Sequence, residues 1–256
     1  MSVLVVEDLA KAFGGVRAVD GVSFTLGPRE LLAMIGPNGA GKSTCFNMVG
    51  GQLRPDRGRV AILGRDTVGW PSRRIWRLGV GRTFQITATF ASMTVRENVQ
   101  TALLSRHRRL GGLWRFARDL YREEADAVLY RVGMADQADR AAGVLAYGDL
   151  KRLELAVALA NDPTLLLMDE PTAGMAPGER RDLMALAARI VKEQGVSVLF
   201  TEHDMDVVFG HADRVLVLDR GRVVTEGPPA AVRDDPEVRR IYLGGTAGRA
   251  GREGAA

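Results

Sequence analysis

Cysteine is almost absent from this chain: Cys45 is the only one among 256 residues. One cysteine cannot form an internal disulfide, so the fold must be held by a buried core, and the composition suits a reducing compartment. A chain of this length is near the size at which one core begins to divide. We therefore expect one domain with a subdomain, and we interpret Cys45 as a small packed residue rather than a reactive thiol.

Long apolar runs are also missing. None approaches the roughly 20 residues that a membrane-spanning helix requires. The opening residues, MSVLVVEDLA, are partly acidic and have no basic flank ahead of an apolar run, which a signal peptide would need. The sequence therefore predicts a chain that is soluble on its own.

Aromatic residues are few around the basic clusters. The formal net charge is +4, and basic residues gather at 73–77 and at 106–109. A nucleic-acid groove interleaves aromatic side chains with such a stripe, and only Trp70, Trp76 and Trp114 lie nearby. We expect no nucleic-acid partner and interpret both clusters as solvated surface. Docking to an anionic membrane surface or to a partner protein is the alternative.

Glycine, by contrast, is concentrated in one stretch with a recognisable spacing, GPNGAGKST. It fits the phosphate-loop pattern G-x-x-x-x-G-K-[ST]. Glycines let the backbone curl so that successive N–H groups face a polyphosphate, and the following helix adds its positive N-terminal end. Lys42 then reaches the β- and γ-phosphates, and the Ser43 hydroxyl can ligate Mg²⁺. The nucleotide-binding residues expected from this loop are Gly36, Pro37, Asn38, Gly39, Ala40, Gly41, Lys42, Ser43 and Thr44.

The surroundings of the loop predict an α/β fold. Leu31–Ile35 is a short apolar run ahead of the loop, and Leu165–Asp169 and Val196–Thr201 are others. Apolar runs that alternate with helical stretches are typical of a parallel sheet covered on both faces. The segments Val3–Val6 and Val22–Leu26 predict an antiparallel layer before the loop. Phe13, beside a glycine pair, is either a core aromatic or exposed enough to stack on a purine.

The middle third of the chain is predicted to be helical. Residues 94–104 and 121–132 carry apolar side chains at helical spacing. Thr94 followed by Glu97 forms the pattern of a capping box. We therefore expect a helical subdomain inserted into the α/β core.

Two acids, Asp169 and Glu170, directly follow the apolar residues 165–168. Asp169 can hold Mg²⁺, directly or through water, and Glu170 can polarise the water that attacks the γ-phosphate. Together with the phosphate loop, these residues indicate an ATP-hydrolysing site.

With these motifs in this order, the chain resembles the ATP-binding subunit of an ABC transporter from about Val3 to Leu243. The resemblance places Phe13 at the adenine-stacking position, and Gln85 at the Q-loop position, where it contributes to catalysis and meets Mg²⁺. It makes His203 the switch histidine that contacts the γ-phosphate, and LAYGD the signature motif before a helix starting near Leu150. The signature residues expected to contact nucleotide are Ala146, Tyr147 and Gly148.

The resemblance also implies a domain organisation. It divides one ATP-binding domain, residues 1–243, into a core of 1–85 and 162–243 and a helical subdomain of about 86–161. The composition of the run GGTAGRAGREGAA predicts a flexible tail, 244–256. In this family two such domains sandwich two ATP molecules head to tail, each nucleotide touching the phosphate loop of one subunit and the signature helix of the other. The second copy is either identical or a related ATPase.

Three positions depart from the common family pattern. Ala146 stands where many members carry a serine, Asp149 replaces a glutamine, and Met175-Ala176 replaces Leu-Asp or Leu-Asn. Because Gly148, Glu170 and His203 remain, we still expect hydrolysis, at a rate that these changes alter. A nucleotide-binding structural subunit without hydrolysis is the alternative.

Within the family, GVGRTFQ, FASMTVRENV, LAYGDLKRLELAVALA and DDPEVRRIYLG are similar to importers of branched-chain and hydrophobic amino acids. Importers of urea and short amides and the lipopolysaccharide exporter share parts of these stretches and stay as alternatives, as does a soluble ABC ATPase. The resemblance implies ATP and Mg²⁺ as cofactors and transmembrane permease subunits as partners. It implies a periplasmic solute-binding protein as an indirect partner, and a peripheral location at the cytoplasmic face of the inner membrane.

Overall fold

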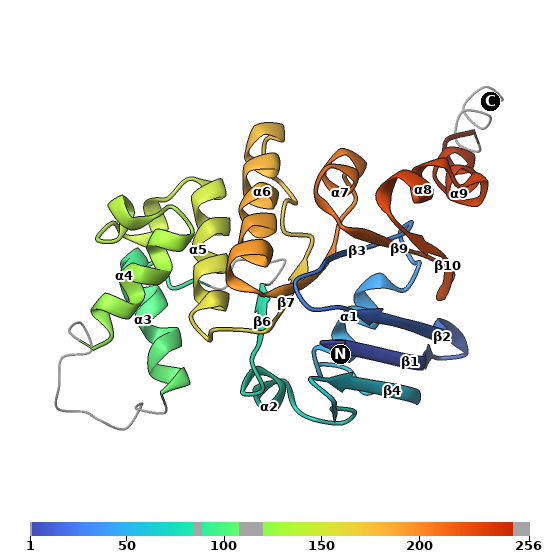
Figure 1. Ribbon diagram of the computed structural model, residues 1–256, viewed down its shortest axis with the longest axis horizontal. Coiled ribbons are helices and arrows are strands. Elements are labelled where there is room, and N and C mark those ends of the chain that lie inside the picture. The colour runs from blue at the N-terminus through green and yellow to red at the C-terminus, as the bar shows by residue number, and fades with distance from the viewer. Residues whose placement is uncertain (1, 84–88, 108–119, 248–256) are drawn as a thin grey trace.

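A six-stranded sheet runs through the middle of the molecule (Figure 1), in a computed structural model that describes residues 2–83, 89–107 and 120–247. The strand order is β10-β9-β3-β8-β7-β6, and the sheet is parallel except for β10, which forms a hairpin with β9. The strands are β3 (Leu31–Ile35), β6 (Val80–Thr83), β7 (Leu165–Asp169), β8 (Ser197–Thr201), β9 (Arg214–Asp219) and β10 (Arg222–Gly227).

A second, antiparallel sheet lies beside the first, with strand order β2-β1-β4-β5. Its strands are β1 (Leu4–Phe13), β2 (Val16–Leu26), β4 (Arg57–Ile62) and β5 (Arg65–Asp66). The hairpin is longer than the two short runs predicted from the sequence. Asp8 adopts a φ of 48°, and the register shifts between Val6 and Leu9, so a bulge carries the strand through its polar stretch.

Helices cover both faces of the central sheet. They are α1 (Lys42–Val49), α2 (Ser72–Trp76), α3 (Val95–Arg106), α4 (Arg122–Arg131), α5 (Tyr147–Leu159), α6 (Pro177–Gln194), α7 (Met205–His211), α8 (Pro229–Asp234) and α9 (Pro236–Ala247), with 3₁₀ turns at Ala135–Gln137 and Ala142–Val144. Among the described residues, none of these helices combines the length and apolar character needed to cross a membrane.

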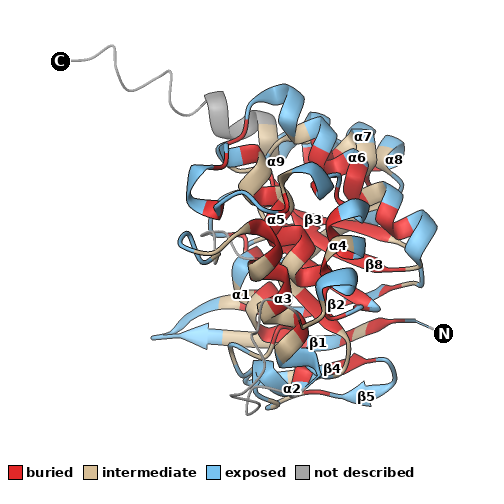
Figure 2. Cartoon of the chain, turned by 90° about the vertical axis from the view of Figure 1, so that its left-hand side faces the viewer, coloured by how far each residue is buried: buried red, intermediate tan, exposed pale blue. Residues whose placement is uncertain are grey.

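The central sheet separates two hydrophobic cores, which Figure 2 shows as buried residues on both sides of it. In β3, Leu31, Ala33 and Ile35 belong to the core shared with α3–α7, whereas Leu32 and Met34 belong to the core shared with α1 and the antiparallel sheet. Alternation along a strand produces this division, because successive side chains point to opposite faces. The prediction of a sheet covered on both faces is confirmed.

The local predictions in the middle third are also confirmed. Thr94 caps α3: its hydroxyl accepts from the Glu97 N–H at 3.1 Å, and the Glu97 carboxylate accepts from the Thr94 N–H at 2.8 Å. Helix α4 buries Ala125, Val128 and Leu129 as its spacing predicts. These side chains share one core with the central sheet, so packing is continuous between the predicted helical subdomain and the core.

Several boundaries differ from prediction. Helix α5 begins at Tyr147, earlier than the predicted start near Leu150, and α9 continues to Ala247, into the stretch predicted as a tail from 244. A glycine costs a helix only about 1 kcal/mol, which disfavours the stretch after Leu243 without forbidding a helix. Strand β6 ends at Thr83, and the predicted strand end at Gln85 lies outside the described residues. Cys45 is buried, and burial raises the pKa of its thiol to about 12, as expected for a packed residue.

Candidate functional site

The phosphate loop connects the end of β3 to the start of α1, whose N-cap is Gly41. Two of its glycines are pressed against backbone. A Cβ at Gly36 would lie 2.2 Å from the Leu218 carbonyl oxygen, and one at Gly41 would lie 2.4 Å from the Ala18 carbonyl oxygen. Gly41 also has a φ of 102°, which favours glycine. The glycine spacing therefore lets the loop pack against β9 and the β1–β2 hairpin.

Lys42 lies over this loop and is almost fully buried. Its ammonium donates to the carbonyl oxygens of Gly36 at 2.7 Å and Pro37 at 3.1 Å. Burial lowers the pKa of Lys42, while the negative charges of Glu170 and Asp169 act in the opposite direction. The lysine is therefore held within the field of both acids that follow β7.

Asp169 and Glu170 lie at the carboxyl end of β7 and are fixed by the end of the neighbouring strand β8. The Thr201 hydroxyl donates to Asp169 Oδ1 at 2.8 Å. The Glu170 N–H lies 3.0 Å from Thr201 Oγ1 and 3.2 Å from its carbonyl oxygen. Glu170 has a φ of 47°, so it leaves the strand direction immediately. Arg82, on β6, places Nη2 3.6 Å from Asp169 Oδ2.

His203 follows β8, and its Nε2 lies 2.8 Å from Glu170 Oε1. Its side chain is 45% exposed, whereas that of Glu170 is 20% exposed. Parallel strands β7 and β8 end at the same edge of the sheet, which brings the two residues together although 33 positions separate them. The arrangement places a carboxylate and an imidazole in direct contact at the mouth of the site.

A cleft of about 230 Å³ unites the predicted residues. It is lined by Ala18, the stretch from Asn38 to Thr44, Glu170 and His203. The loop, the acid and the histidine, predicted from three distant parts of the sequence, therefore share one cavity. Gly36 and Pro37 support it through their contacts with Lys42.

The remaining predicted site residues lie elsewhere. Phe13 is 50% exposed near the tip of the hairpin that also contributes Ala18 to the cleft, and its stacking role stays a prediction. Gln85 lies outside the described residues. The predicted signature residues Ala146, Tyr147 and Gly148 are at the start of α5. There, Ala146 and Gly148 line a different hollow of about 110 Å³, together with Met175 and Glu179.

Sequence reasoning missed several residues that shape the site. Thr201 holds Asp169 and Glu170, Ala18 lines the cleft, and Arg82 lies beside Asp169. Glu202 is buried next to His203 and accepts hydrogen bonds from Thr172. The available signal for Glu202 was an acid directly after an apolar strand, which by itself indicates only a strand end.

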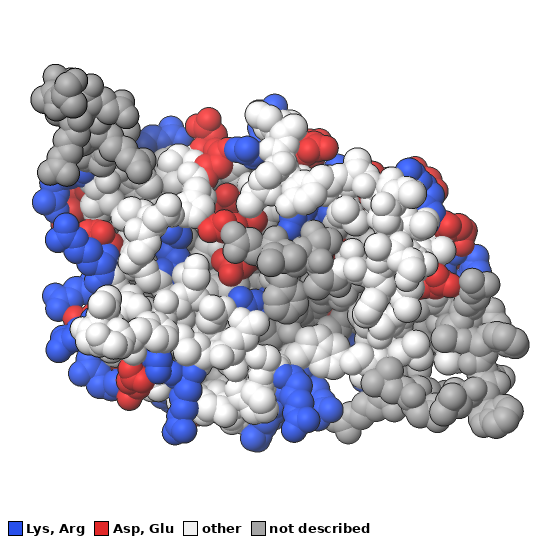
Figure 3. Space-filling view, turned by 180° about the vertical axis from the view of Figure 1, so that it is seen from behind, with Lys and Arg blue, Asp and Glu red and all other residues white. Residues whose placement is uncertain are grey.

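The basic clusters lie away from the cleft lining. Lysine and arginine side chains also lie on other parts of the surface, and Figure 3 shows them along the lower edge and the left side of the rear face. In the first cluster, the Arg74 guanidinium lies 3.5 Å from the centre of the Trp70 ring. In the second, His107 stacks on Tyr121 with ring centres 4.4 Å apart, while Arg108, Arg109 and nearby Trp114 lie outside the described residues. What these clusters contact stays a prediction.

Comparison with known proteins gives consistent results. Residues 19–173 match the family model described as ABC transporter, and residues 222–248 match that of the branched-chain amino acid ATP-binding cassette transporter. The high-affinity branched-chain amino acid transport ATP-binding protein LivG of Salmonella typhimurium is 39% identical, covering 94% of this chain and 97% of that protein. BraF of Pseudomonas aeruginosa, described in the same words, is 39% identical over 94% of this chain and 98% of its own length.

Solved structures are similar as well. The ADP conformation of an ATP-binding cassette of an ABC transporter superposes with a TM-score of 0.85 and 32% identity, covering 95% of this chain and 99% of that one. A nucleotide-free cassette superposes with a TM-score of 0.83 and 31% identity, covering 94% and 99%. The similarity to these proteins, in sequence and in fold, therefore extends over nearly the whole chain.

Proposed function

This chain belongs to the ABC transporter family of ATP-binding proteins, and from that premise we propose that it hydrolyses ATP to drive import of branched-chain or other hydrophobic amino acids. The observation that carries the proposal is the cleft shared by the phosphate loop, Glu170 and His203. The solute class rests on the names of the relatives and on the match at residues 222–248.

The backbone of the loop and the start of α1 bind the phosphates. Free N–H groups at a helix N-terminus and the helix dipole favour an anion, and the curled loop adds further N–H groups. Lys42 adds a positive charge in a nearly water-free setting, where electrostatic attraction is stronger than in solvent. These groups account for nucleotide binding without the participation of Glu170.

Glu170 and His203 account for hydrolysis. Glu170 accepts a proton from the attacking water, and its contact with His203 orients the carboxylate and brings the imidazole to the cleft. A general base of this kind contributes roughly 10²–10⁴-fold to a rate. His203 is well placed to hydrogen-bond the γ-phosphate, because it lines the same cleft as the loop.

The residues near the loop fit a Mg²⁺ ion. Ser43 lines the cleft with a hydroxyl, and Asp169 presents a carboxylate fixed by Thr201. Oxygen ligands of this kind, completed by phosphate oxygens and water, are what Mg²⁺ prefers. Among the described residues there is no group of three or more His, Cys, Asp or Glu placed to hold a metal ion. When bound, Mg²⁺ neutralises the phosphate charge; Gln85 is the further ligand that the resemblance implies.

A second ATP-binding subunit completes the site. Ala146 and Gly148 line a hollow separate from the cleft that holds Lys42, so one chain does not bring the loop and the signature helix to one nucleotide. A head-to-tail pair does so, with Ala146, Tyr147 and Gly148 of one subunit facing the loop of the other.

A transmembrane permease is the proposed membrane partner. A groove of about 400 Å³ lies between α2, β6, α3 and α5 and is lined by apolar side chains, among them Ile75, Trp76, Phe90 and Val157. Phe90 is 53% exposed there, as expected for a side chain that a partner covers. Docking at this groove would hold the chain at the cytoplasmic face of the membrane, with a periplasmic solute-binding protein as an indirect partner across it.

The test uses the complex purified from its native membrane and reconstituted in liposomes. We expect Mg·ATP hydrolysis that rises when a leucine-loaded solute-binding protein is added and does not rise with the leucine-free protein. If permeases co-purify but leucine does not stimulate hydrolysis, the transport function is supported and the proposed solute class is contradicted. Absence of a membrane partner would contradict the transport function itself.

A further inference from the structure

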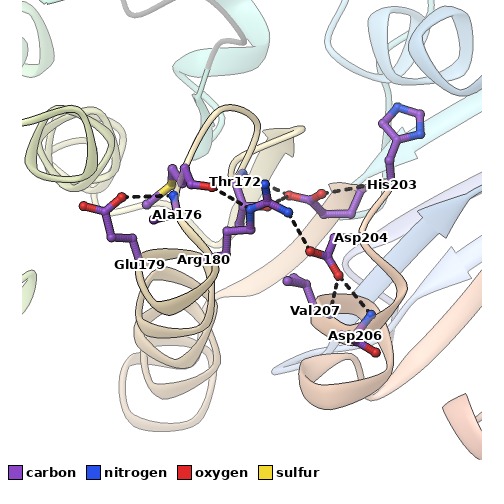
Figure 4. Close-up of polar contacts among 10 residues, drawn as sticks. Thr172, Ala176, Glu179, Arg180, His203, Asp204, Asp206 and Val207 are labelled. Carbon is purple, nitrogen blue, oxygen red and sulfur yellow. Dashed lines mark hydrogen bonds and ion pairs between the residues drawn. The ribbon is translucent and has the colours of Figure 1, made fainter.

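The loop that carries His203 is tied to the stretch Thr172–Arg180, here named the 172–180 segment, by two separate interactions (Figure 4). The first runs through Glu202. Glu202 is 4% exposed, and its Oε1 accepts from the Thr172 N–H at 2.9 Å and from the Thr172 hydroxyl at 2.6 Å. Its Oε2 accepts from the His203 N–H at 3.1 Å. One buried carboxylate therefore joins the backbone of His203 to a residue two positions after Glu170.

The second interaction runs through Arg180, at the start of α6. Its Nη1 donates to Asp204 Oδ2 at 2.7 Å, and its Nε donates to the Met175 carbonyl oxygen at 2.7 Å. Asp204 in turn caps α7 by accepting from the N–H groups of Asp206 at 3.0 Å and Val207 at 3.3 Å. His203 is thus flanked on both sides by an acid that is anchored to the 172–180 segment.

The imidazole of His203 needs such an anchor. In Figure 4 its side chain points away from Arg180 and Thr172. The side chain is 45% exposed, and its Nε2 lies 2.8 Å from Glu170 Oε1. The ring is therefore placed mainly by the backbone on which it stands. Glu202 accepts a hydrogen bond directly from that backbone. Loss of this bond is unfavourable, because it leaves a buried carboxylate oxygen without a hydrogen-bond donor.

The 172–180 segment also touches the start of α5. The Tyr147 hydroxyl donates to the Ala173 carbonyl oxygen at 3.1 Å. A Cβ at Gly148 would lie 2.9 Å from Glu179 Oε1, so that carboxylate is packed against the signature helix. The segment therefore lies between the helix start predicted to face the partner's nucleotide and the loop that carries His203.

We infer that Glu202 and Arg180 are positioning residues that hold His203 against Glu170 and make its position depend on the 172–180 segment. The inference rests on the proposed ATPase function, because a positioned histidine matters only if the cleft turns over ATP. Neither residue lines the cleft, so both act on the rate of hydrolysis and leave nucleotide binding intact. Movement of α5 in an ATP-bound pair then reaches His203 through hydrogen bonds within the same chain.

The test is Glu202→Gln in the reconstituted complex. The amide keeps an oxygen for Thr172 but turns an NH₂ group toward the His203 N–H, which breaks only the link to the histidine. We expect kcat to fall by about 10- to 100-fold, since a misplacement of about 1 Å can cost that much. The KM for ATP and the binding of a fluorescent ATP analogue stay at wild-type values. Asp206→Asn, which changes an exposed acid on α7 close by, is the matched control and leaves kcat unchanged.

A double-mutant cycle separates positioning from a general structural role. If Glu202 acts through His203, Glu202→Gln has no further effect on the single-turnover rate in a His203→Ala background. A loss by the same factor in both backgrounds would show that Glu202 acts on stability and would overturn the inference. If Glu202→Gln fails to bind the fluorescent nucleotide, the same cycle is run with Arg180→Met, for which we expect the same dependence on His203, and Arg180→Lys restores part of the rate.

The controls also distinguish the two proposals. If the wild-type complex hydrolyses ATP and Glu202→Gln does so at the same rate, the positioning role is overturned and the proposed ATPase function is not. A wild-type complex that binds but does not hydrolyse ATP overturns the proposed function, and the inference falls with it.

Discussion

The phosphate loop and the His203 loop meet in one cleft but are built differently. The first is a backbone structure, in which Gly36 and Gly41 pack against carbonyl oxygens of Leu218 and Ala18 with no room for a Cβ. The second is held by side chains, since Thr201 and Glu202 fix Glu170 and His203 through hydrogen bonds. A rigid backbone structure, here called the cradle (residues 36–44), suits phosphate binding, which needs N–H groups in fixed positions. Side-chain hydrogen bonds can be rearranged, which suits the proposed dependence of His203 on a partner subunit.

Lys42→Ala is the strongest test of this difference, because it removes the one charged side chain of the cradle and leaves its backbone. We expect turnover to fall by at least about 100-fold and nucleotide binding to weaken, as for loss of a group that stabilises charge in the transition state. ATPase assays and titration with a fluorescent ATP analogue measure both. Normal ATPase activity in this variant would overturn the assignment of the loop.

Glu170→Gln tests the side-chain half of the cleft. The amide cannot accept the proton of the attacking water, so we expect a loss of roughly 10²–10⁴-fold in kcat with ATP binding intact. The ATP-bound pair then accumulates and appears as a dimer in size-exclusion chromatography. A variant that stays monomeric at saturating Mg·ATP would contradict the head-to-tail pair.

Gly41→Ala tests the backbone half. A Cβ there meets the Ala18 carbonyl at 2.4 Å, at a φ of 102°. We expect a loss of about 2–6 kcal/mol in the free energy of unfolding from clash and strain. Gly178→Ala, in α6 with no heavy atom within 4 Å of the added Cβ, is the control and should be neutral or stabilising by up to about 1 kcal/mol. Equal effects in denaturant unfolding would show that the close approach at Gly41 has no energetic role.

Glu30→Gln tests whether the ion pair of Glu30 with Arg214, at the start of β3, affects stability but not the rate of hydrolysis. Burial opposes ionisation of Glu30, but hydrogen bonds from Arg214 and the Gly27 N–H outweigh it and lower its pKa below 4.5. A carboxyl group whose pKa is lower in the folded state than in the unfolded state stabilises the fold when it is ionised. This stabilisation is fully present above the unfolded-state pKa and is lost as the pH falls through the folded-state pKa. We expect the variant to be less stable at pH 7 by on the order of 1 kcal/mol, since solvent screens the pair in part. The difference should shrink in unfolding curves below pH 4.5, and kcat should not change. A difference that is constant with pH would contradict this interpretation.

Features built from residues close together in the sequence can be predicted from it. The phosphate loop and the Thr94 capping box are local patterns, in which every residue needed lies within a few positions. Glu202 and Thr172 are 30 positions apart and meet because strands β7 and β8 are neighbours, a relation that no local periodicity records. Local pattern therefore predicts the phosphate loop and the two acids at the carboxyl end of β7, the family resemblance adds His203, and neither predicts the contacts that orient these residues.

Helix α5 shows a second limit. Gly148 is a poor helix former and Ala146 has no side chain to cap the helix, so local propensity favours a start near Leu150. The structure begins the helix at Tyr147, whose hydroxyl bonds to Ala173 while Glu179 packs on Gly148. Tertiary contacts thus supply what the local sequence does not.

The topology of the central sheet sets the order in which the protein can become active during its synthesis. The antiparallel sheet joins strands close in sequence and can form early. Strand β3, at 31–35, obtains its neighbours β8 and β9 only when residues 197–201 and 214–219 have left the ribosome. Domains fold as their chain emerges, and pairings between distant segments form late. A nascent chain therefore carries its phosphate loop well before it gains a supported ATP site, because β8 and β9 must emerge first.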